Sequence, residues 1–154
     1  MTVPDNIFAL EEGIRARLVA KIPGVEIGSF PDDPAAYRLR HQRGALLVGY
    51  RGGSFERPLD HDEIAQFRTM TMAVLVFGRA LNGHQGAYAY LEAVRAALVE
   101  YDLDGFEPLA AAGEAFLGHD EGVWMYELRV ETRSIALAVP EDEVDAVIAE
   151  LLNG

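Results

Sequence analysis

Few residue types in this chain stand at a spacing that could support catalysis or metal binding. The four histidines are separated from one another, so no His-x-His or His-Glu-x-x-His pair predicts a metal site. A histidine base needs a nucleophile or substrate within hydrogen-bond reach, and the sequence offers no matched partner. Ser29, Ser54 and Ser134 lie outside any Gly-x-Ser-x-Gly nucleophile elbow. We therefore expect no catalytic residue, no cofactor-binding residue and no metal ligand.

The polar motifs of the chain have structural explanations. The two His-Asp-Glu triplets, residues 61–63 and 119–121, are typical of solvated turns. The glycine-rich Arg51–Ser54 stretch lacks the Lys-Ser/Thr ending of a phosphate loop, so we expect residues 51–58 to form an irregular, mobile connection. The four carboxylates between Glu141 and Asp145 stand near the start of a predicted helix, where the helix dipole stabilises them.

Composition limits the class of protein. With 154 residues, half of them hydrophobic, the chain is the size of one domain spanning residues 1–154. The formal charge of -12 and the single lysine, Lys21, disfavour nucleic-acid binding, which draws its affinity from a basic surface. The absence of cysteine excludes disulfides and suits a reducing cytoplasm. Apolar runs such as 73–77 are too short to span a membrane, and we expect neither a signal peptide nor a membrane helix.

Helical periodicity occurs in three segments. Asp5 or Asn6 can cap a first helix that ends before Pro23-Gly24. A second helix is predicted over 87–100, and a short terminal helix after Pro140. Each segment has an apolar stripe, and we expect the second helix to pack on the sheet. The stripes are Ile7, Leu10, Ile14 and Leu18; Tyr88, Leu91, Val94, Ala97 and Leu98; and Val144, Val147, Ile148 and Leu151.

Strand periodicity accounts for most of the remaining chain. We expect strands over 25–30, 45–50 and 66–77, and the second half of the last of these is apolar on both faces, which predicts cover on both sides. Residues 106–117 and 124–137 then predict a long antiparallel ribbon joined by a loop over 118–122. The predicted fold class is α+β, with a mixed, mainly antiparallel sheet flanked by helices and a long C-terminal β-hairpin.

The predicted ribbon has one face for the core and one for solvent or a partner. Trp124 and Leu128 alternate with Glu127 and Arg129, which is the period-2 pattern of a half-buried strand. Charge is also segregated along the chain. Five arginines lie between residues 37 and 58, whereas no lysine or arginine follows Arg133. A basic and an acidic region on one small domain predict either a solvated uneven surface or head-to-tail contacts that can close into a ring.

Four segments together resemble one family: 46–58, 68–77, 83–98 and 120–126. The resemblance is to tail proteins of Mu-like prophages and related contractile-tailed phages, and in particular to tail terminator, or tail-completion, proteins. It covers most of the chain and carries no catalytic signature. It implies a mixed sheet flanked by helices and a non-enzymatic, hexameric ring that caps the head-proximal end of the tail tube and sheath. The implied location is the virion, at the head–tail junction, after assembly in the host cytoplasm.

The same resemblance implies particular contacts. We expect a homo-hexamer that meets tail tube and sheath proteins on one side and neck or head-completion proteins on the other, with no membrane partner and no cofactor. DNA would pass through an acidic lumen without specific binding, because like charges repel. Alternatives are a head-side neck connector, or a small cytoplasmic enzyme or ligand-binding domain. The expected interface residues are Arg51, Phe55, Arg57, His119, Asp120, Glu121, Glu127, Arg129, Glu131 and Arg133.

Overall fold

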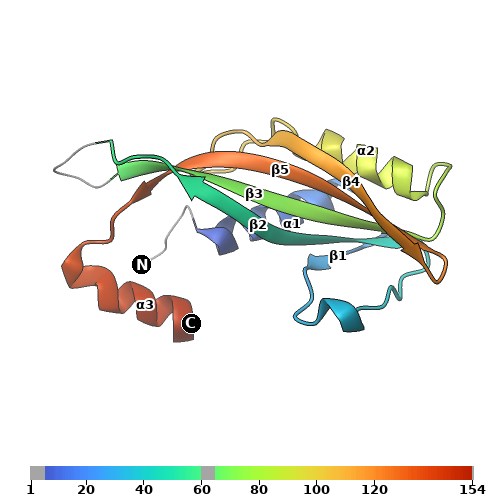
Figure 1. The fold of residues 1–154 in the computed structure, drawn as a ribbon, viewed down its shortest axis with the longest axis horizontal. Helices are drawn as coiled ribbons and strands as arrows, with labels where there is room; N and C mark the ends of the chain where they lie inside the picture. Colours follow the sequence, from blue (N-terminus) through green and yellow to red (C-terminus); the bar gives the residue numbers. More distant parts are fainter. Residues whose placement is uncertain (1–5, 60–64, 154) are drawn as a thin grey trace.

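The computed structural model describes residues 6–59 and 65–153, and its centre is a five-stranded sheet (Figure 1). The strand order is β1-β2-β3-β5-β4, in which β1 runs parallel to β2 and the other neighbours are antiparallel. The predicted α+β class with a mixed, mainly antiparallel sheet is therefore confirmed. The elements are α1 Ile7–Lys21, β1 Glu26–Ser29, η1 Pro34–Ala36, β2 Gly44–Phe55, β3 Ala65–Gly78, α2 Ala87–Leu98, β4 Ala110–Asp120, β5 Val123–Leu137, η2 Glu141–Glu143 and α3 Val144–Asn153.

Helix α1 forms where its cap and its apolar spacing agree. The side chain of Asn6 accepts a hydrogen bond from the backbone N–H of Ala9 at 2.8 Å, which satisfies one of the free donors of the first turn. Leu10, Ile14 and Leu18 are fully buried on one face, as their spacing predicts. The other cap considered, Asp5, lies outside the described residues.

Helix α2 is two residues shorter than predicted. It ends at Leu98 because Glu100 adopts a positive φ of 66°, which a continuing helix does not allow. Leu91 and Val94 are buried on the sheet, as expected. Tyr88, which the spacing placed in the apolar stripe, is 47% exposed, and Tyr90 is buried instead.

The second half of β3 is covered on both faces, which confirms the interpretation of its two-sided apolar run. Met72, Val74 and Val76 face a large core shared with α1 and α2. Phe77 faces a smaller core on the opposite face of the sheet. We call this face the open face, because neither α1 nor α2 covers it. The segment between β1 and β2, with Tyr37 and Leu39, packs against this smaller core.

Strand β2 continues to Phe55, so the predicted irregular connection over 51–58 is wrong for residues 51–55. Residues up to Phe55 pair with β3, after a register shift between Tyr50 and Gly52. The shift leaves Arg51 as the extra residue of a β-bulge, and such bulges accommodate glycine without ending a strand. At Gly53 an added Cβ would meet a β3 carbonyl oxygen at 2.2 Å, so the glycine permits close strand pairing.

The β4–β5 hairpin differs from the prediction in the length of its loop and in the residue at which β4 begins. Pairing extends to Asp120 opposite Val123, which leaves only Glu121 and Gly122 as the loop where five residues were expected. Both loop residues have positive φ, 49° and 77°, as a two-residue turn matched to strand twist requires. The preceding strand begins at Ala110 instead of residue 106, since the chain before it is drawn into the core.

Helix α3 exposes most of its predicted apolar stripe. The chain after Pro140 first forms the short η2 turn, and α3 follows it. Only Val147 is buried, whereas Ile148 and Leu151 are 47% and 45% exposed. In Figure 1, α3 projects from the end of β5 instead of lying on the sheet.

Candidate assembly surface

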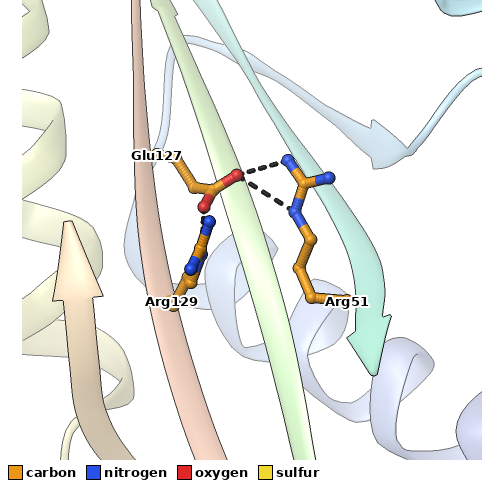
Figure 2. A network of polar contacts seen from close by, with 3 residues as sticks. All are labelled: Arg51, Glu127 and Arg129. Atoms are coloured by element: carbon orange, nitrogen blue, oxygen red, sulfur yellow. Dashed lines mark hydrogen bonds and ion pairs between the residues drawn. The ribbon is translucent and has the colours of Figure 1, made fainter. Parts of the chain in front are cut away.

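A buried carboxylate, that of Glu127 on β5, lies on the open face. The side chain of Glu127 is 1% exposed and accepts a hydrogen bond from Arg51 Nε at 3.1 Å. Arg51 Nη2 and Arg129 Nε also donate to the same carboxylate, one to each oxygen (Figure 2). The prediction that Glu127 lies on a solvent face is therefore wrong. Two arginines cover it, and Arg51 reaches it from β2 across the intervening strand β3.

The electrostatics of Glu127 follow from these contacts. Burial alone would raise the pKa of the carboxyl group, but the hydrogen bonds from Arg129 and Arg51, together with their positive charges, outweigh it and lower the pKa below its ordinary value. Glu127 is thus ionised at neutral pH. The network links β2 to β5 at the position where the bulge turns Arg51 toward the open face.

A shallow polar depression adjoins this network. It is lined on β2 by Arg51 to Ser54, on β3 by Thr69 and Thr71, and on β5 by Arg129 and Glu131. Of the residues expected at an interface, Arg51, Glu127, Arg129 and Glu131 are thus brought together by the sheet. Hydroxyls, charged side chains and glycine backbone line the depression.

Arg133 lies further along β5, in a separate ion pair. Its Nε and Nη2 donate to the two oxygens of Glu107 at 2.9 Å and 3.0 Å, and its guanidinium lies 4.0 Å from the ring centroid of Phe67. The hydrogen bond from Arg133 lowers the pKa of the exposed Glu107 carboxyl. Both groups are accessible to solvent, so the pair orients side chains more than it stabilises the fold.

The remaining expected interface residues lie at the two ends of the sheet. Phe55 is 57% exposed near the end of β2, where Arg68 stacks 5.2 Å from its ring centroid, and Arg57 is exposed just beyond it. His119 stands at the hairpin end with its ring 4.2 Å from that of Trp124. Asp120 and Glu121 form part of the exposed turn beside it. The structure therefore does not gather the ten residues into one patch.

Sequence reasoning missed the outer edge of the sheet. Strand β4 is an edge strand, and ten of its eleven residues are exposed. Phe116 and Leu117 are 55% and 46% exposed, and Phe116 contacts the ring of Tyr126 at a centroid distance of 5.2 Å. Together with Tyr88 on α2, these rings line a partly apolar groove of about 320 Å³. The signal available in the sequence was the alanine-rich, weakly polar run at 109–117.

No group of three or more His, Asp or Glu among residues 6–59 and 65–153 is placed to hold a metal ion. Burial and the neighbouring Glu26 raise the pKa of Tyr37 to about 12, which makes its hydroxyl a poor base or nucleophile. The triplet 61–63 lies outside the described residues. None of the helices in the described part of the chain has the length and apolarity needed to cross a membrane.

Comparisons with known proteins identify the family. A chain in the virion of a native gene transfer agent (GTA) particle shares the fold, with a TM-score of 0.57 and 16% sequence identity over 82% of this chain and 95% of that chain. No curated protein matches the chain in sequence. The family model described as Gp37 protein matches residues 14–152, which includes every strand of the sheet. The chain therefore belongs to the Gp37 protein family.

Proposed function

We propose that this chain is a non-enzymatic structural protein of a phage or GTA-like virion, and specifically a tail terminator. In this role, six copies form a ring that caps the head-proximal end of the tail tube and sheath and provides the surface that joins the neck. Two findings support a virion role: the Gp37 family match and the fold shared with a chain of a GTA virion. The ring itself is our inference from the surfaces of the sheet.

The observation that carries the proposal is the open edge of β4. Strands that end a sheet expose unpaired N–H and C=O groups, and soluble proteins normally shorten, charge or cover them. This edge is eleven residues long, with exposed Phe116 and Leu117 and a single charged residue, Glu114, before residue 119. Such an edge is an aggregation hazard in a free monomer, and assembly into a closed ring removes it.

The opposite side of the sheet offers a second free edge. Strand β1 pairs with β2 only as far as Val48, so the outer half of β2, up to Phe55, has β3 on one side only. The pair of Arg51 with Glu127 holds this outer half to β5. A protomer with one edge at β4 and another at the outer half of β2 has the two different surfaces that a heterologous ring contact requires.

DNA compatibility is the second requirement of the role. A ring at the head–tail junction must let DNA pass through its lumen without retaining it. The formal charge of -12 disfavours phosphate binding over most of the surface. We infer that carboxylates line the lumen and that tail tube, sheath and neck proteins meet the two faces of the ring.

The test is the mass of the purified protein, measured by light scattering over a range of concentrations, with and without purified tail tubes. We expect a hexamer, or a monomer that assembles on tube ends. Leu117→Lys should weaken assembly, because a charge on the β4 edge opposes strand pairing. Val19→Lys is the matched control, since Val19 is 64% exposed and lies on helix α1, outside both edge strands.

Two outcomes overturn the proposed role, and a third overturns the β4 contact. A monomer at every concentration that also ignores tail tubes would favour a ligand-binding or enzymatic domain. A ring that binds purified heads but not tail tubes would favour a head-side neck connector. Equal assembly of the Leu117→Lys and Val19→Lys variants would refute the β4 edge as a contact.

A further inference from the structure

The apolar stripe of α3 is exposed at one end of the molecule. Val147 is buried, but Ile148, Leu151 and Leu152 are 47%, 45% and 77% exposed. The helix has ten residues, and helices this short are marginal in water unless an apolar face is packed. Within the described residues, the element it contacts most is η2, the turn that directly precedes it. Its exposed stripe is therefore a surface suited to burial against another surface.

The segment that carries α3 is strongly acidic. No lysine or arginine follows Arg133, and the carboxylates of η2 and α3 are Glu141, Asp142, Glu143, Asp145 and Glu150. The first four lie at the N-terminal end of the segment, where the helix dipole favours negative charge. We call the segment 138–153 the acidic arm. A partner for the arm must combine apolar contact with positive charge.

The opposite end of the same chain has both properties. Arg38, Arg40, Arg43 and Arg79 are exposed there, and among the described residues none of them forms an ion pair with a carboxylate. Arg79 donates to the carbonyl oxygens of Leu39 and His41, both at 2.9 Å, which fixes it in place. We call the segment 38–43, together with Arg79, the basic end.

A pocket of about 210 Å³ opens within the basic end. Arg38 and Arg79 line it together with the apolar side chains of Leu39, Phe77 and Met125. Its acidic rim is formed by Asp120 at the end of β4 and by Glu121 of the hairpin turn. Arg38 is also held, because it donates to the carbonyl oxygens of Ala35 and Tyr37. The pocket thus offers apolar surface beside two fixed guanidinium groups, which is the counterpart of a helix with leucines on one face and carboxylates at its start.

We propose that the acidic arm of one copy docks on the basic end of the next copy. Figure 1 shows α3 and the segment around η1 at opposite ends of the elongated sheet, so the two surfaces cannot meet within one chain. The contact is heterologous, and repeated contacts of this kind close into a ring. The partner is a second copy of this chain, because the chain carries both complementary surfaces: the acidic arm with its apolar stripe and the basic end with its apolar pocket. The inference rests on the proposed ring and names one of its contacts.

Two full-length variants test the contact. The arm variant carries Leu151→Glu and Leu152→Glu, and the end variant carries Arg40→Glu and Arg43→Glu; these side chains are exposed. Each variant alone should self-associate about tenfold more weakly than the wild type by sedimentation velocity. A mixture of the two should form a one-to-one complex, in which the intact arm of the end variant docks on the intact basic end of the arm variant. The complex should grow no further, because its remaining arm and its remaining basic end are both mutated.

Cross-linking supplies a second readout, because the natural chain has no cysteine. Leu152→Cys combined with Gln42→Cys should give disulfide-linked dimers and larger ladders under mild oxidation. The control combines Val19→Cys with Gln42→Cys and should stay largely monomeric. Urea unfolding of every variant is the folding control. Midpoints equal to that of the wild type would establish that a variant loses association without losing its fold.

The outcomes separate this inference from the proposed function. If the wild type and both variants form the same ring and the Leu152–Gln42 cysteine pair gives no ladder, the arm contact is refuted and the terminator role stands. If the arm variant forms rings normally but no longer binds purified tail tubes, the arm engages the tube and the inference is again refuted. If the wild type never assembles, the proposed function itself fails.

Discussion

The buried carboxylate Glu127 allows a quantitative prediction. Replacing it with glutamine keeps the shape of the side chain but removes the charge that Arg51 and Arg129 approach. Breaking a fully buried ion pair costs about 3–5 kcal/mol, because the surviving charge is stranded. Here the arginines are 40% and 53% exposed, so water can solvate them after the change. We therefore expect Glu127→Gln to lower the free energy of unfolding by about 1–2 kcal/mol.

A double-mutant cycle isolates the contact across β3. Arg51→Met keeps the aliphatic part of the arginine and should cost about 1 kcal/mol. The double variant should be less destabilised than the sum of the two single variants, with a coupling of about 1 kcal/mol. Urea unfolding followed by fluorescence is suitable, because Trp124 is the only tryptophan and lies on β5, three residues from Glu127.

The pH dependence fixes the sign of the effect. The pKa of Glu127 is lower in the folded protein than its ordinary value, so its ionised form stabilises the fold at pH values above the ordinary pKa. That stabilisation is lost as the pH falls through the folded pKa. The difference between wild type and Glu127→Gln should be constant near neutral pH and shrink below about pH 4. A coupling near zero, or a difference that grows on acidification, would refute the reasoning.

Three further changes test the fold by unfolding free energy in urea. Ile14→Ala empties a fully buried site in the large core and should cost about 2–5 kcal/mol, whereas the exposed Val19→Ala should change stability by less than about 0.5 kcal/mol. Gly44→Ala places a Cβ 2.2 Å from a backbone carbonyl oxygen of β3 and should cost about 1–3 kcal/mol; Gly113→Ala, with open space around it, is the control. Glu121→Asn should stabilise the hairpin by about 0.5 kcal/mol, because asparagine tolerates the positive φ of that position better.

Local features of the fold could be predicted because they depend on neighbouring residues. Asn6 caps α1 through a backbone group three residues away, and Leu10, Ile14 and Leu18 form a stripe by helical spacing alone. The alternation of Leu128 and Val130 with charged residues likewise identified the core face of β5. These patterns give α+β class and the order of elements, since each is set within a few residues of sequence.

Features that depend on strand neighbours could not be predicted. Glycines at 52 and 53 weaken a strand locally, yet pairing with β3 extends β2 to Phe55. The exposed β4 edge and the exposed stripe of α3 were missed for a related reason: an apolar pattern shows that a face can be buried, not whether the same chain buries it.

The sequence by itself determined the helices, the strand faces and the absence of a recognisable catalytic motif, because periodicity and motif spacing are local properties. Only the tertiary structure decided that Glu127 is buried. The bulge at Arg51 and the register of β2, β3 and β5 bring two arginines onto one carboxylate, and Arg51 is 76 residues away in sequence. Alternation assigns Glu127 to the open face, but only the packing of separate strands determines what covers that face.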